Sequence, residues 1–186
     1  MSSKSPSSPV ERIPPQSIEA EQSLLGALLI DKDAVIKVAD VVMPEDFYKD
    51  THRMIYEAMA GLFYDREPID LLSLGNRLEE KKQLETVGGR AYLIELSNAV
   101  PTSANVSHYA GIIQKKATLR RLQQAAAQIS TLSFEEAEEV DHLLDKAEQK
   151  LFSVSQKYLK QAFIPVRDVL TEAFDRIDEI HSEKGK

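Results

Sequence analysis

The stretch NVSHYAGIIQKKATLRRLQQAAAQISTL, residues 105–132, decides the fold that the sequence predicts. No proline interrupts it, and its apolar side chains recur every three or four residues, which is the period of an α-helix. We therefore expect one long helix with a single apolar face, made by Tyr109, Ile112, Leu119, Leu122, Ala126 and Ile129.

A second long stripe with the same spacing follows a short break at residues 133–136. Two long helices joined by a short link predict an antiparallel hairpin over residues 102–158. Residues 104–134 carry four basic and no acidic side chains, whereas residues 135–148 carry seven acidic ones. The basic cluster of Lys115, Lys116, Arg120 and Arg121 is the one candidate for phosphate contact, but no aromatic residues stand between its cations for base stacking. We therefore favour its pairing with the acidic arm, inside the hairpin or between subunits.

The residues before the hairpin predict a compact bundle of short helices. Over residues 14–101 apolar positions keep the helical period, but proline and glycine interrupt them repeatedly. Ser17 and Asp70 each stand at the N-cap position of an expected helix, and Gly88 with Gly89 predicts a turn. No segment alternates as a strand does, so the predicted fold class is all-α.

The two ends of the chain differ from its centre. Residues 1–13 are rich in Ser, Pro and Lys, which predicts a disordered arm. Residues 159–186 predict a linker in which Pro165 starts a separate amphipathic helix. Such a lone helix is expected to dock in a groove of another subunit or domain, through Val166, Leu170, Phe174 and Ile177.

Two long apolar stripes exceed what one hairpin can bury. Val106, Ile113, Leu132 and Phe152 lie off its main seam and are expected to face water, which favours oligomerisation. The residues that we expect in the hairpin core or the dimer interface are Leu119, Leu122, Ile129, Leu143, Leu144 and Leu151.

Composition limits the possible functions. The net charge of −7 disfavours extensive binding of a phosphate backbone, so little direct DNA contact is expected and any contact must be local. The chain has no cysteine, which fits a cytoplasmic protein. The longest apolar run, residues 24–30, is far shorter than the roughly 20 residues of a membrane span, so no membrane association is expected.

The sequence predicts no catalytic, metal or nucleotide site. It contains no G-x-x-x-x-G-K-[ST] phosphate loop, so ATP hydrolysis is not expected of this chain. His52, His108, His142 and His181 lack the spacing of metal ligands and are interpreted as surface residues. A phosphotransfer role for His108 or His142 is a weaker alternative.

The motifs of the bundle are residues 15–26 (PQSIEAEQSLLG), 44–48 (PEDFY), 52–53 (HR), 55–58 (IYEA), 68–71 (PIDL), 87–89 (VGG), 92–93 (YL) and 98–101 (NAVP). Residues 104–105 (AN) and 108–110 (HYA) follow at the start of the hairpin. Together these motifs resemble the N-terminal region of replicative DNA helicases of the DnaB family. The resemblance covers nearly all of residues 14–186. Two later segments resemble the hairpin arms of that family: residues 119–122 (LRRL) and 147–152 (AEQKLF).

The resemblance implies a non-catalytic collar and linker of a hexameric, ATP-dependent 5'-3' helicase. It implies dimerisation through the hairpin, a hexamer built as a trimer of dimers, recruitment of primase, and docking of the linker helix on a neighbouring motor domain. A helicase loader is a further candidate partner. ATP and magnesium would belong to a RecA-like motor domain that this chain lacks, and the expected location is the bacterial cytoplasm, at the replisome. The alternative is a stand-alone helical adaptor or inhibitor of replication proteins.

Overall fold

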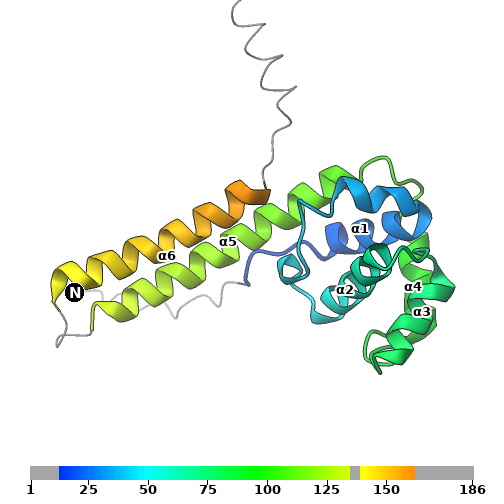
Figure 1. Cartoon of the computed structure of the whole chain (residues 1–186), viewed down its shortest axis with the longest axis horizontal. Helices are drawn as coiled ribbons and strands as arrows, with labels where there is room; N and C mark the ends of the chain where they lie inside the picture. The colour runs from blue at the N-terminus through cyan, green and yellow to red at the C-terminus, as the bar shows by residue number, and fades with distance from the viewer. Residues whose placement is uncertain (1–12, 135–138, 162–186) are drawn as a thin grey trace, which may run out of the picture.

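The computed structural model describes residues 13–134 and 139–161, which form helices and connecting loops without a β-strand (Figure 1). The all-α fold class is confirmed for these residues. Residues 1–12 of the arm and 162–186 of the linker, with Val166, Leu170, Phe174 and Ile177, lie outside the described residues, whereas residues 159–161 belong to the last described helix. The helices are α1 (Ile18–Ile30), η1 (Lys32–Lys37), η2 (Pro44–Asp46), α2 (Asp50–Tyr64), α3 (Leu71–Glu80), α4 (Gly89–Asn98), α5 (Val106–Leu132) and α6 (Val140–Gln161).

The helices α1 to α4 form a compact head, and its helix starts agree with the sequence prediction. The Ser17 hydroxyl accepts a hydrogen bond from the backbone N–H of Ala20 at 3.4 Å, and the Asp70 carboxylate accepts one from Ser73 at 2.8 Å. These contacts satisfy N–H groups that the first turn of a helix leaves unpaired. Gly88 and Gly89 form the predicted turn, both with positive φ. Both N-caps and the turn are confirmed.

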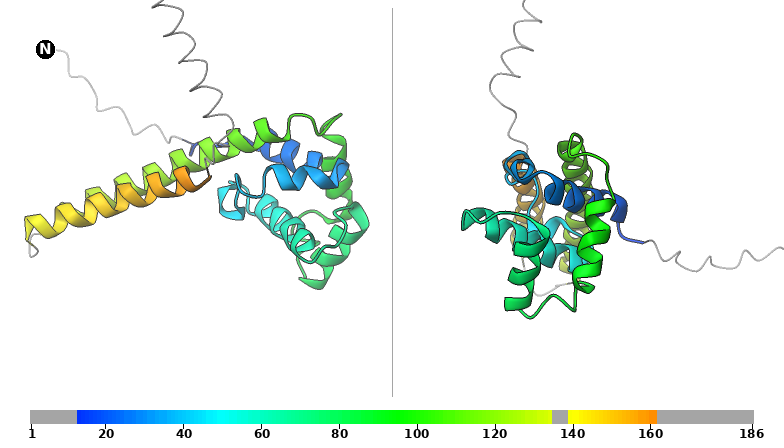
Figure 2. Two further views of the ribbon diagram at one scale, coloured as in Figure 1. Left: turned by 45° about the horizontal axis from the view of Figure 1, so that its top comes forward. Right: turned by 90° about the vertical axis from the view of Figure 1, so that its right-hand side faces the viewer.

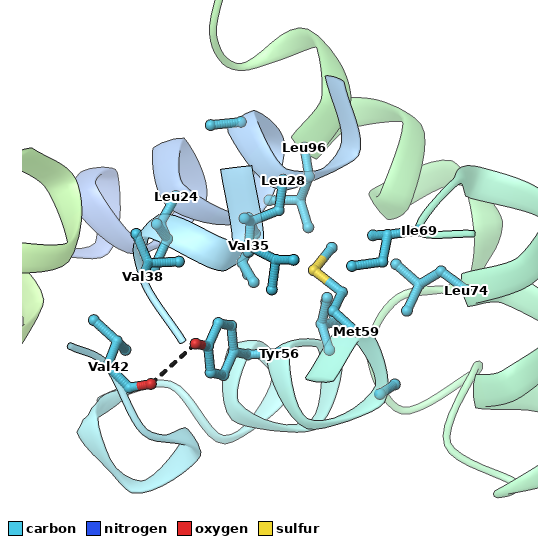
Figure 3. Packing of buried hydrophobic residues seen from close by; sticks show 14 of the residues in the cluster. Leu24, Leu28, Val35, Val38, Val42, Tyr56, Met59, Ile69, Leu74 and Leu96 are labelled. Atoms are coloured by element: carbon cyan, nitrogen blue, oxygen red, sulfur yellow. Dashed lines mark hydrogen bonds between the residues drawn. The ribbon is translucent and has the colours of Figure 1, made fainter. Parts of the chain in front are cut away.

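The core of the head is apolar and closely packed around α1 (Figure 3). Leu24 and Leu28 of α1 are fully buried, as is Met59 of α2. Gly26 allows α4 to approach α1, because a Cβ atom at this position would lie 2.2 Å from the carbonyl oxygen of Leu96. The two helices are therefore in contact along their backbones.

The helix α5 belongs to both the head and the hairpin. Its first turns pack in the head core, and its later turns run beside α6 away from the head (Figures 1 and 2). Val106 and Ile113 are buried in that core, so the prediction that they face water is wrong. Both residues pack against side chains of the head. The helical period of α5 alone does not show that the head covers this part of the helix. Leu132 is half-buried, and Phe152 is exposed as expected.

The buried phenol of Tyr56 joins α2 to the loop before η2. Its hydroxyl donates a hydrogen bond to the carbonyl oxygen of Val42 at 2.9 Å (Figure 3). Burial raises the pKa of Tyr56 well above its ordinary value of 10.0, and the charge of Asp46 raises it further. The folded protein therefore holds this phenol neutral, and its contribution to stability is present below pH 10 and lost as the pH rises above it.

The substitution Tyr56→Phe should lower the free energy of unfolding by about 1–2 kcal/mol at neutral pH, because the Val42 carbonyl loses its donor. It should also reduce the loss of stability above pH 10. Urea unfolding at several pH values measures both effects. Tyr64→Phe, at an exposed position, is the control and should change neither. Equal alkaline slopes for Tyr56→Phe and wild type would contradict the assignment.

Candidate interface of the helical hairpin

One side of the hairpin carries exposed leucines from both helices. Leu119 and Leu122 of α5 are 39% and 45% exposed, and Leu144 and Leu151 of α6 are 58% and 46% exposed. We call these four residues the apolar face. Large apolar side chains that stay exposed together on a folded chain mark an interaction surface.

The seam between α5 and α6 lies beside the apolar face. Ala125 is buried there, and Ile129 and Leu143 are half-buried. The two half-buried residues therefore contribute to packing within one chain. That the six residues form a dimer interface stays a prediction. The four residues of the apolar face are exposed and so accessible to a second chain.

Two arginines join the base of the hairpin to the head. The guanidinium of Arg120 donates to the carbonyl oxygens of Pro15 at 2.8 Å and Asp46 at 2.5 Å, and it lies 5.7 Å from the ring centroid of Tyr48. Arg121 forms an ion pair with the carboxylate of Asp46. Burial lowers the pKa of Arg120 from its usual value. The prediction that these two arginines pair with the acidic arm is therefore wrong.

Asp46 is the acceptor around which this junction is built. Its side chain is 0% exposed, and its second carboxylate oxygen accepts a hydrogen bond from the backbone N–H of Met43 at 2.9 Å. A buried carboxylate is tolerated when a cation and hydrogen-bond donors surround it. The pair brings together residues that are 75 positions apart in the sequence, and no local pattern indicates such a contact.

A second buried polar network lies in the head. His52 is 0% exposed, and its Nδ1 atom lies 2.7 Å from a carboxylate oxygen of Glu21. Its Nε2 atom lies 2.7 Å from the hydroxyl of Tyr92. Glu21 also accepts a hydrogen bond from the backbone N–H of Tyr48 at 2.7 Å. The network links α1, α2 and α4 to the loop that positions Tyr48 against Arg120.

The interpretation of His52 as a surface residue is wrong. Its acidic partner Glu21 lies on another helix, 31 positions away, and spacing along one helix cannot identify such a partner. His108 and His142 are exposed, and His181 lies outside the described residues. Among residues 13–134 and 139–161, no three His, Asp or Glu side chains are grouped so that they could hold a metal ion. No described helix is long and apolar enough to span a membrane.

Comparisons with known proteins agree with this architecture. Residues 13–115 match the family described as "DnaB-like helicase N terminal domain". The replicative DNA helicase DnaB of Geobacillus stearothermophilus is 43% identical over 176 residues, which are 95% of this chain and 39% of that protein. The replicative DNA helicase DnaC of Bacillus subtilis is 40% identical, over 94% of this chain and 38% of its own length. The chain thus spans less than half of these relatives.

A solved structure extends the agreement to three dimensions. The crystal structure of the N-terminal domain of DnaB helicase from Mycobacterium tuberculosis superposes with a TM-score of 0.73 at 36% identity. The match covers 76% of this chain and 99% of that one. A DnaB-like replicative helicase of 22% identity shares the fold, with a TM-score of 0.62 over 84% of this chain and 34% of its own length.

Proposed function

Because this chain belongs to the family of DnaB-like helicase N-terminal domains, we propose that it is the non-catalytic collar and linker region of a replicative DNA helicase. In this proposal the hairpin pairs two chains, and three such pairs organise the ring of the helicase. ATP and magnesium act in a motor domain, and the residues 159–186 connect the collar to that domain.

The apolar face is the observation that carries the proposal. Four leucines from two helices are exposed on a hairpin that extends away from the head. Burying apolar surface contributes about 25 cal/mol per Å², which makes pairing with a second copy favourable. The junction of Arg120 and Arg121 with the head holds the hairpin in one orientation, and so presents this face for pairing.

We also propose that the assembled collar recruits primase and that a helicase loader is a second partner. Support for primase comes from the solved DnaB-like replicative helicase of similar fold, whose structure is described together with its interactions with primase. Recruitment in this proposal depends on the assembled collar, so assembly is the first step to test.

The substitution Leu122→Asp should convert the assembled chain to a monomer. Pairing would bury the new carboxylate without a partner, which costs several kcal/mol. Light-scattering mass across a concentration range measures the change, and wild type should have the mass of a dimer or a multiple of it. Gln123→Asp adds the same charge at the next, exposed position of α5 and is the control.

Two results would contradict the proposal. One is a wild-type chain that stays monomeric at high concentration. The other is an equal loss of mass in Leu122→Asp and Gln123→Asp, because a general effect of charge would then replace burial at the apolar face. Thermal unfolding followed by circular dichroism shows that both variants keep the helical fold.

A further inference from the structure

A polar groove runs between α5 and α6 with a volume of about 590 Å³. Its walls come from the distal half of α5 and from most of α6. Two residues of the apolar face directly follow residues of the groove in the sequence, in the pairs Arg121 and Leu122, and Lys150 and Leu151. Since neighbouring residues of a helix point about 100° apart, the groove and the apolar face lie on different sides of the hairpin.

The groove has a strongly positive lining. Three lysines of α6, Lys146, Lys150 and Lys157, contribute to it, and none of the described lining residues is acidic. Arg121 also lines the groove, but its charge is paired with the carboxylate of Asp46. The acidic residues of α6, such as Asp145 and Glu148, line a different hollow on that helix. The charges of α6 are therefore separated by side, in a chain whose net charge is −7.

The remaining polar lining consists of neutral hydrogen-bonding groups. Gln124 and Gln128 of α5 face Gln149 and Ser153 of α6, and the Lys150 ammonium donates to the Gln128 side-chain oxygen at 3.0 Å. Amides and hydroxyls can both donate to and accept from a ligand. The lining contains no aromatic side chain on which a base could stack.

We propose that this groove binds the phosphate backbone of single-stranded DNA. Cations along a helix face are the electrostatic footprint of a nucleic-acid site. The three lysines extend over about 16 Å of α6, because a helix rises about 1.5 Å per residue, and this length spans several consecutive phosphates. Binding is independent of base sequence, because the contacts are to the backbone.

The shape of the groove favours one strand over a duplex. Packed helices lie about 8–10 Å apart, so the hollow between them is too narrow to receive a DNA duplex. The chemistry also disfavours an acidic peptide. Peptide segments gain most of their docking energy from large apolar anchors in pockets, whereas the apolar lining here consists of Ala125, Leu132 and Val154 beside the seam.

The test measures binding of a fluorescein-labelled oligothymidylate of about 20 nucleotides to the 186-residue chain by fluorescence anisotropy. The double variant Lys150→Glu and Lys157→Glu should bind at least about tenfold more weakly at 50 mM salt, because each lost phosphate contact removes a released counterion. The slope of log K against log salt should also become shallower by about 1.4, at roughly 0.7 per contact.

The control is the double variant Lys37→Glu and Lys115→Glu, which changes the net charge equally at exposed positions outside the groove. It should bind nearly as wild type does. Lys150→Gln with Lys157→Gln provides a milder change if the charge reversal prevents folding, and it should give the same ranking. A duplex of the same length and an oligouridylate show whether a single DNA strand is preferred.

Three outcomes would overturn the proposal. The first is that wild type does not bind oligothymidylate at low salt. The second is that the groove variant and the control weaken binding equally. The third is that the groove binds polyglutamate but not oligothymidylate. The last would assign the groove to an acidic protein segment. The readout is independent of the mass measurement that tests assembly, because the groove and the apolar face are separate.

Discussion

Replacing Arg121 with alanine is expected to lower the free energy of unfolding by about 3–5 kcal/mol, because the buried carboxylate of Asp46 then loses its cation. Arg121 is 17% exposed in its side chain and Asp46 is 0% exposed, so water reaches the pair poorly. Removing one partner of a buried ion pair costs more than the pair itself contributes. Urea denaturation followed by circular dichroism measures the loss.

The matched control for this prediction is Arg53→Ala. Arg53 pairs with Asp50 at 2.8 Å, but both side chains are well exposed, so the loss should stay below about 1 kcal/mol. The double variant Asp46→Asn with Arg121→Met removes both charges and should lose less than the sum of the two single changes. If Arg121→Ala and Arg53→Ala lower the free energy of unfolding equally, the buried ion pair stabilises the fold no more than the exposed one, which would contradict the prediction.

Replacing Glu21 with alanine is expected to lower the free energy of unfolding by about 3 kcal/mol or more. The carboxylate, 2% exposed, accepts from the backbone N–H groups of Tyr48 and Lys49 and lies beside His52. Each buried polar group that loses its partner costs about 1–3 kcal/mol, and this substitution affects several at once. Urea denaturation at neutral pH measures the change.

Glu19→Ala is the control for this second prediction. Glu19 is an exposed acid in the same first turn of α1, so its removal costs the favourable interaction with the helix dipole, about 0.3–1 kcal/mol. Glu21→Gln keeps an oxygen acceptor and should lose less than Glu21→Ala does. A loss below 1 kcal/mol for Glu21→Ala would mean that water or a neighbouring group replaces the carboxylate.

The elements of this fold follow from local patterns in the sequence. The absence of proline between residues 105 and 132 and the period of its apolar residues predict α5, which begins at Val106 and ends at Leu132. The caps at Ser17 and Asp70 are equally local.

The contacts that shape the candidate interface could not be predicted in the same way. A helical period shows which residues share a face, but it does not show that α5 meets the head at Ile113 and α6 at Ala125. The partners of His52 and Arg121 lie on elements far away in the sequence. The charge counts predict the acidic arm as the partner of the basic cluster. In the fold, Arg121 of that cluster pairs with Asp46 of the head instead.

The continuity of α5 has a mechanical consequence. The helix runs unbroken from the head core at Val106 to Leu132 near the far end of the hairpin. It therefore has no hinge at the boundary between the head and the hairpin. The hairpin and the head therefore move together as one body. In the collar that we propose, a change of the opening would turn whole chains against one another.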